Sequence, residues 1–169
     1  MIKVIIGSLL CSFIFITSSH ARPTKLSGPR VGITTFTPGE ISDYLNTHHV
    51  TQYGWQFETR FTDGEDFMGL VEWVILAGGM EKGYFLPSVS SLIGFRGNGG
   101  FEFGIGPNLS LTGIGLVYAA GYNFKLGKVN LPINLSWVPS KNSSEDHEGQ
   151  VGHRISLTIG FNMDSAEKK

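Results

Sequence analysis

The sequence predicts an all-β protein, an antiparallel up-and-down β-barrel of eight strands. Three observations lead to this prediction. Apolar and polar side chains alternate along most of the chain, turn residues divide it into eight segments of about ten residues each, and charged residues make up only 16%. Because successive side chains of a strand point to opposite faces, such alternation indicates a sheet with one apolar and one polar face. In soluble domains about a quarter of the residues are usually charged, so a chain with so few charged residues is unusual.

The N-terminus has the features of a secretion signal. Lys3 precedes an apolar run from Val4 to Ile16, and Ser19-His20-Ala21 supplies the small residues of a cleavage site. The apolar run is too short to cross a bilayer as a helix, which needs about 20 residues. We therefore expect a signal peptide over residues 1–21 and a single barrel domain over 22–169.

The first half of the barrel domain is predicted to contain four strands and one short helix. In the second strand Tyr53, Trp55 and Phe57 share one parity, while glutamine, glutamate and arginine share the other. The third and fourth strands carry apolar residues on both faces. The sequence TPGE at 37–40 has the spacing of a capping box with proline at the first helical position, which predicts a helix over about 38–46. The strands are expected over residues 30–37, 50–61, 69–79 and 84–95.

The second half of the domain is predicted to contain four more strands. Tight turns are expected at 97–100 and 126–128, and a longer connection over 139–149. Alternation is clean in the fifth, seventh and eighth strands, whereas the sixth sets large apolar side chains against glycine and alanine. A short polar tail, residues 162–169, ends the chain. The strands are expected over residues 101–109, 112–125, 129–138 and 150–162.

The charges of the polar face indicate that this face lines the interior of the barrel. An unpaired buried charge costs several kcal/mol, and the fork of an arginine side chain suits pairing with a carboxylate. No lysine falls in the middle of a predicted strand, although water-facing sheets usually carry lysine. We expect three glutamates and three arginines to form a polar network in the lumen: Glu58, Arg60, Glu72, Arg96, Glu102 and Arg154.

Large aromatic residues are predicted to form two girdles. If the first strand runs outward, one rim receives five phenylalanines, which are Phe61, Phe95, Phe101, Phe124 and Phe161. The other rim receives Tyr53, Phe85 and Trp137. Two aromatic girdles around an aliphatic band are typical of a barrel in a bilayer, and long connections on the outer side are typical of outer-membrane barrels. Both long connections, 38–49 and 139–149, fall on that outer side.

Over about residues 30–163 this pattern resembles the small eight-stranded outer-membrane β-barrel proteins of Gram-negative bacteria. The resemblance is one of architecture and includes no diagnostic motif. It implies export to the outer membrane, contact with outer-membrane lipid, and a structural or binding role exerted through loops 38–49 and 139–149. The architecture is porin-like, but eight strands enclose too little room for a diffusion pore. Such proteins typically end on an aromatic residue, whereas here Phe161 is followed by the polar tail 162–169.

The sequence predicts a protein that is not an enzyme and binds no nucleic acid, because it carries no catalytic motif and a net charge of only −1. Two other functions stay open. One is a lipid-modifying outer-membrane enzyme that uses His153 as a base, with a partner from another strand because Ser156 has the opposite parity. The other is a secreted soluble barrel of the lipocalin type, with the aromatic face turned inward around an apolar ligand.

No metal or cofactor is expected. The single cysteine, Cys11, lies within the predicted signal peptide, which leaves no thiolate ligand in the barrel domain. The candidate metal ligands are His48, His49 and His147, since the first and last long connections of a closed barrel are neighbours and imidazole binds transition metals.

Overall fold

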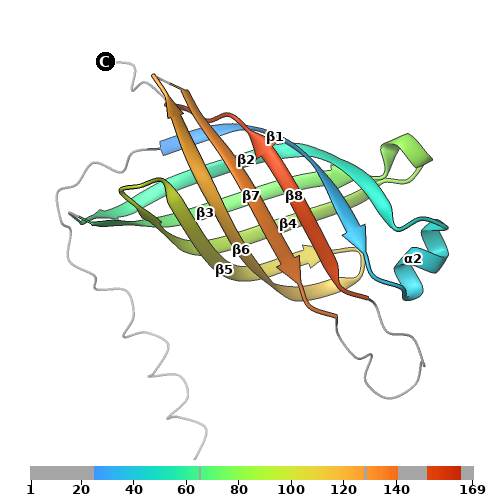
Figure 1. The fold of residues 1–169 in the computed structure, drawn as a ribbon. Coiled ribbons are helices and arrows are strands. Elements are labelled where there is room, and N and C mark those ends of the chain that lie inside the picture. Colours follow the sequence, from blue (N-terminus) through green and yellow to red (C-terminus); the bar gives the residue numbers. More distant parts are fainter. Residues whose placement is uncertain (1–24, 65, 128, 141–151, 165–169) are drawn as a thin grey trace, which may run out of the picture.

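The protein forms a closed antiparallel β-barrel (Figure 1). The computed structural model describes residues 25–64, 66–127, 129–140 and 152–164. Each barrel strand pairs with its neighbours in sequence, and the ring closes because the first strand, β1, pairs with both β2 and β8. This confirms the predicted eight-stranded up-and-down barrel. The predicted signal peptide, His147 and most of the connection 139–149 lie outside the described residues.

The barrel strands agree with the predicted segments to within a few residues. A further two-residue strand, β9 (Met163–Asp164), follows β8 and pairs with the start of β1. Within the described ranges no helix is long and apolar enough to cross a membrane. The barrel strands of the described chain are β1 (Lys25–Phe36), β2 (His49–Asp63), β3 (Phe67–Gly78), β4 (Leu86–Gly97), β5 (Phe101–Ser110), β6 (Gly113–Leu126), β7 (Val129–Val138) and β8 (Arg154–Gly160).

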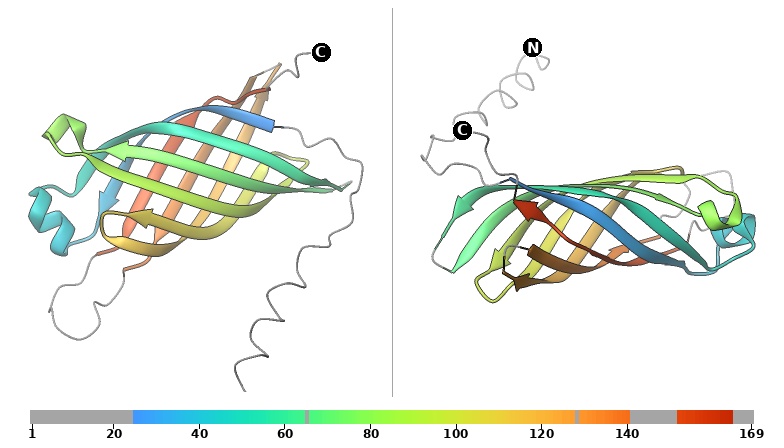
Figure 2. Two further views of the ribbon diagram at one scale, coloured as in Figure 1. Left: turned by 180° about the vertical axis from the view of Figure 1, so that it is seen from behind. Right: turned by 90° about the horizontal axis from the view of Figure 1, so that it is seen from above.

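The two ends of the barrel differ in the length of their connections (Figure 2). One end, called here the helical end, carries the helix α2 (Glu40–Leu45), the 3-10 turn η1 (Met80–Lys82) and the connection between β7 and β8. The opposite end, called the turn end, carries the short links from β2 to β3, β4 to β5 and β6 to β7. Both long connections therefore leave from the same end, as the predicted strand directions require.

The strand β1 begins at Lys25, earlier than the predicted start at residue 30. Leu26 and Gly28 are buried like Arg30 and share its parity, so the inward-facing series extends toward the N-terminus. Gly28 is required at its position, because a Cβ there would lie 1.6 Å from the carbonyl oxygen of Phe161. The additional residues at the start of β1 pair with β9 and lengthen the strand pairing that closes the barrel.

The predicted helix exists, but the predicted capping box at 37–40 is wrong by two residues. The helix starts at Glu40, with Gly39 as its N-cap. The Ser42 hydroxyl accepts the Gly39 N–H at 2.9 Å and donates to the Gly39 carbonyl at 2.8 Å. Thr37, the expected cap, instead accepts the backbone N–H of His153 at 2.7 Å through its hydroxyl. Residues 39–42 have the spacing of a capping box, in which the Ser42 hydroxyl accepts the backbone N–H of the N-cap residue Gly39.

A small hydrophobic core fixes α2 against the rim of the helical end. Leu45 of the helix is buried with Phe36 at the end of β1 and Val50 at the start of β2. Tyr84 and Leu86 pack against these three residues from the connection into β4. Burial of such side chains stabilises by roughly 1.5–3 kcal/mol each, which is enough to order a helix too short to be stable by itself.

Candidate functional site: polar interior and apolar outer face

The outer face of the barrel is apolar on every strand. The three tryptophans of the chain, Trp55, Trp73 and Trp137, all point outward and are 40%, 51% and 43% exposed. Single exposed apolar side chains are ordinary, but soluble monomers rarely expose contiguous apolar patches of more than a few hundred Å². Here the exposed apolar side chains lie on all eight barrel strands, from Val31 on β1 to Ile159 on β8.

The aromatic residues expected in the two girdles all lie on the outer surface, between 42% and 66% exposed. Toward the turn end lie Phe61, Phe95, Phe101, Phe124 and Phe161. Toward the helical end lie Tyr53, Phe85 and Trp137. Two exposed aromatic residues lie outside the predicted strands: Phe67, which opens β3, and Tyr44 on α2.

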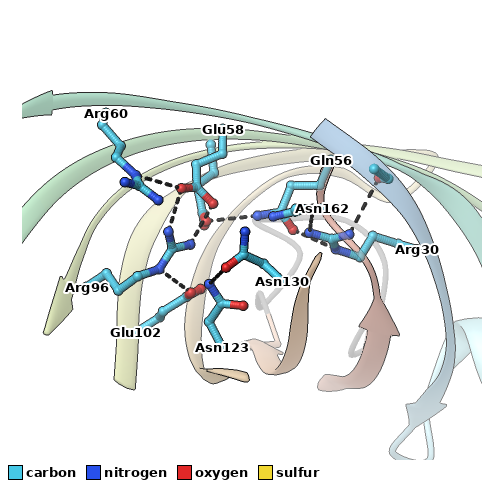
Figure 3. Close-up of polar contacts among 11 residues, drawn as sticks. Arg30, Gln56, Glu58, Arg60, Arg96, Glu102, Asn123, Asn130 and Asn162 are labelled. Carbon is cyan, nitrogen blue, oxygen red and sulfur yellow. Dashed lines mark hydrogen bonds and ion pairs between the residues drawn. The ribbon is translucent and has the colours of Figure 1, made fainter. Parts of the chain in front are cut away.

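Three of the predicted interior charges form a compact ion-pair cluster near the turn end (Figure 3). Arg96 on β4 is fully buried, and its two terminal nitrogens donate to both carboxylate oxygens of Glu58 on β2 at 2.6 Å. Its Nε donates to Glu102 on β5 at 2.5 Å. Arg96 and Glu102 are directly opposed in the ladder between β4 and β5, so their backbones hold them in register. Arg60 lies at the edge of this cluster, with its Nε 3.6 Å from Glu58.

A chain of hydrogen bonds extends from the cluster around the interior (Figure 3). Glu72, opposite Glu58 in the ladder between β2 and β3, accepts the amide N–H of Gln56 at 2.8 Å. The Gln56 oxygen in turn accepts the Nε–H of Arg30 at 2.9 Å. A terminal nitrogen of Arg30 donates to Asn162 at 2.6 Å, which ties β1 to the chain that follows β8. The strands β1, β2 and β3 and the segment that follows β8 are thereby connected through one polar layer.

Arg30 is the interior charge that sequence reasoning missed. It was placed at the first residue of the predicted strand, and its parity was not counted with the polar face. It is 2% exposed, and its inward direction follows from the parity that it shares with Thr34 on β1. Among the described residues, four arginine and three glutamate side chains therefore face the barrel interior, whereas the sequence predicts three of each.

Arg154 is not part of the ion-pair cluster. It opens β8 at the helical end, where one terminal nitrogen donates to the Ser110 hydroxyl at 2.8 Å and the other to the Asn108 amide oxygen at 2.7 Å. The amide nitrogen of Asn108 in turn donates hydrogen bonds to the hydroxyls of Ser88 at 2.8 Å and Ser90 at 2.9 Å. Among the described residues Arg154 makes hydrogen bonds to neutral groups and no ion pair. The predicted single network is thus divided into two layers along the barrel axis.

The barrel interior contains small cavities beside both polar layers. One cavity of about 60 Å³ lies in the middle of the barrel between Glu72, Leu70 and Val117. Another of about 60 Å³ lies toward the helical end beside Gln52 and Arg154. The inward residues of β6 are small, with Ala119 and Gly121 lining the first cavity, which explains why the interior is not completely filled.

The histidines that the structure describes, His48, His49 and His153, occupy exposed positions at the helical end. The His153 ring stacks on Trp137 with centroids 6.0 Å apart, and its Nδ1 accepts the backbone N–H of Ser140 at 3.1 Å. Ser156 faces the interior and shares a 2.6 Å hydrogen bond with Thr34, so it does not approach His153. His49 contacts the Thr35 hydroxyl through Nδ1 at 3.1 Å. No group of three or more metal-ligating side chains occurs among the described residues.

Comparisons with known proteins find similarity in structure but not in sequence. No family model matches the chain, and no curated protein matches it. Among solved structures, Neisserial surface protein A has 12% identity and a TM-score of 0.47, covering 83% of this chain and 96% of its own. The Yersinia pestis outer membrane protein Ail has 14% identity and a TM-score of 0.44, covering 83% and 99%. The de novo designed protein TMB2.3 has 12% identity and a TM-score of 0.46, covering 87% and 98%.

The closed ring of eight strands, with charges inside and aromatics outside, has the architecture of the small outer-membrane β-barrel proteins. The chain therefore resembles that class in fold, as the alternation of its sequence predicts.

Proposed function

We propose that the protein is an integral outer-membrane β-barrel whose outer face lies in lipid. The observation that carries this proposal is the outward direction of the aromatic and aliphatic side chains around the whole ring, with Arg96 and Glu58 buried inside. A soluble barrel that holds an apolar ligand needs the opposite arrangement. In this barrel Trp55, Phe57 and Trp73 point away from the interior, so the aromatic face does not enclose a cavity.

The backbone also suits a bilayer. Lipid offers no hydrogen-bond partners, so strands can cross a membrane only in a closed ring without edges. Here every barrel strand has two neighbours, and the seam is closed by the pairing of β1 with β8. A transmembrane strand needs about 9–11 residues, and β5, β6 and β7 contain 10, 14 and 10.

The role of the barrel is structural or consists of binding through the helical end. The interior supports no wide channel, because Arg96 and Asn162 are completely buried and the two interior cavities described above are small. The helical end instead presents an ordered surface, since α2 is fixed by the core around Leu45. Tyr44 of the helix is 73% exposed there and contacts Tyr84 with ring centroids 5.8 Å apart. Loops 38–49 and 139–149 are the segments that would contact a partner.

Fractionation of the native host tests this proposal. Membranes are washed with alkaline carbonate, and the chain is detected by blotting, with a known integral barrel and a known peripheral protein as controls. We expect retention in the washed outer membrane, faster gel migration before boiling than after, and an N-terminus that begins after Ala21. Release of the chain into the periplasmic or carbonate-soluble fraction would contradict the proposal.

A further inference from the structure

The interior near the helical end holds several hydrogen-bond donors that have no partner among the described residues. A guanidinium has five N–H donors, and Arg154 uses one on Ser110 and one on Asn108. The other three donors of Arg154 make no hydrogen bond within the described part of the chain, so we treat them as open to a ligand. Arg96 at the turn end differs in this respect, because carboxylates accept hydrogen bonds from three of its nitrogens.

The hydroxyl groups around Arg154 add to this excess of donors. Both amide hydrogens of Asn108 are directed at serine oxygens, those of Ser88 and Ser90. Because each of these hydroxyls already accepts a hydrogen bond, its own proton is free to donate elsewhere. The Thr34 and Ser156 hydroxyls share one hydrogen bond between them, which leaves one further proton.

These groups form part of the wall of the cavity of about 60 Å³ at the helical end, together with apolar side chains of the neighbouring strands; the polar part includes Thr34, Ser88, Ser90, Asn108, Ser156 and Arg154. A buried water molecule needs roughly 10–15 Å³ of cavity volume, so this cavity has room for a polyatomic ion. Gln52, which is 8% exposed, also lines it, and its buried amide oxygen has no hydrogen-bond partner. The oxygen and nitrogen of an amide exchange places by a flip of the side chain, so Gln52 can offer the cavity a donor as well.

The Arg154 side chain lies between this cavity and the helical end. The same side chain lines a smaller hollow of about 20 Å³ between the β5–β6 turn and the β7–β8 connection, beside Thr112, Pro139 and Gly152. The guanidinium therefore lines both hollows, while the serine hydroxyls line only the larger one.

We infer that Arg154 and the hydroxyls around it form a binding site for an oxyanion, a phosphate or sulfate group. The arginine fork pairs with such groups in a bidentate manner, and the hydroxyl protons supply the remaining hydrogen bonds. The bound anion would also balance the excess of one arginine over the glutamates in the described interior. This inference concerns the interior of the barrel and holds whether the outer face lies in lipid or not.

Titration of the purified full chain in a maltoside detergent, which contains no phosphate, tests the inference. Sodium sulfate and inorganic phosphate are added at constant ionic strength, and the Arg154 side-chain N–H signal and the Ser110 amide signal are followed by NMR. We expect a saturable shift of both signals. In Arg154→Gln the affinity should fall by about tenfold or more, since a charge-assisted hydrogen bond contributes about 1.5–3 kcal/mol.

Two variants keep the test decisive. Lys82→Gln removes the same charge from an exposed position on the same end and should leave the titration unchanged. Ser90→Ala keeps every charge and removes one hydroxyl, so it should weaken binding several-fold even if Arg154→Gln fails to fold. A response that never saturates, or one that is equal in the wild type, Arg154→Gln and Ser90→Ala, would overturn the inference and leave only water in the cavity.

The source of the anion is settled by competition. A phosphate-bearing lipid is added to the micelles while sulfate is bound. Displacement of sulfate would assign the site to a lipid headgroup, and undisturbed sulfate binding would assign it to a free anion. Either result agrees with an oxyanion site at Arg154.

Discussion

The two ends of the barrel interior hold arginines in opposite ways. At the turn end, Arg96 is fully buried and bonded on three nitrogens to the carboxylates of Glu58 and Glu102. At the helical end, Arg154 lies beside a cavity and donates to a serine and an asparagine. The turn end therefore compensates charge with charge, whereas the helical end disperses one charge over neutral groups. On our proposal, the turn end serves stability and the helical end serves binding.

The connections follow the same division. Short turns link the strands at the turn end, while the helical end carries α2, η1 and a small core of its own around Leu45. Local structure that does not depend on the barrel ladder can change without opening the barrel. We therefore expect substitutions at the turn end to act on the whole barrel and most substitutions at the helical end to act locally.

The largest effect is expected for Arg96→Met. Removing one partner of a buried ion pair destabilises by about 3–5 kcal/mol, because the remaining charges stay buried without compensation. Urea unfolding in micelles, followed by gel migration, measures the change. Adding Glu58→Gln and Glu102→Gln to the same chain should recover most of the loss, since no isolated charge is then left. Equal instability of the single and the triple variant would show that the cluster acts through packing alone.

A smaller and local effect is expected for Leu45→Ala. Truncating a buried leucine costs about 2–5 kcal/mol, and the low end applies here because the core around α2 is small and can relax. Protease cleavage between residues 37 and 48 should increase, while the unfolding midpoint of the barrel stays the same. Glu40→Ala, an exposed change on the same helix, should stay within about 0.5 kcal/mol. A fall in the barrel midpoint would mean that the helical end is not independent.

Arg154→Met is expected to destabilise the barrel by only about 1–2 kcal/mol, because it leaves neutral hydrogen-bonding groups without a partner rather than a charge. The same urea series measures it beside Arg96→Met. A loss as large as that of Arg96→Met would remove the contrast between the two ends.

The smallest effect concerns Glu81 in η1. Its carboxylate accepts the Thr51 backbone N–H at 2.7 Å and the Thr51 hydroxyl at 2.5 Å, which lowers the pKa of Glu81 below its ordinary value. The ionised form is therefore favoured in the folded state. Its stabilisation is complete above the ordinary pKa of about 4.3 and is lost as the pH falls through the lowered value.

Hydrogen exchange of the Thr51 amide measures this effect. Protection should fall on acidification below about pH 4 in the wild type and should be weaker at neutral pH in Glu81→Gln. An amide protected equally at all pH values in both chains would show that the carboxylate does not hold the turn.

The alternation of the sequence was sufficient to predict the fold, because the side-chain period of a strand fixes which residues face inward. It could not give the height of a residue along the barrel or its partners across the interior. Glu58, Arg96 and Arg154 were therefore assigned to one network, although the structure separates Arg154 from the other two. Arg30 stands at the start of the predicted strand, where the preceding glycine and proline weaken the alternation, so the pattern does not reveal that its side chain faces inward. The apolar inward residues of β3, such as Leu70 and Val74, line the central cavity and explain why alternation was poor there.

The most direct test of the outward apolar face is tryptophan quenching in reconstituted bilayers. Trp55 and Trp73 lie within β2 and β3, and Trp137 lies at the helical end of β7. In single-tryptophan chains, lipids brominated deep in the acyl chain should quench Trp55 and Trp73, and lipids brominated near the headgroup should quench Trp137, while aqueous iodide quenches none of them strongly. Strong quenching of all three by iodide, with no effect of brominated lipid, would show that this surface faces water and would contradict the account.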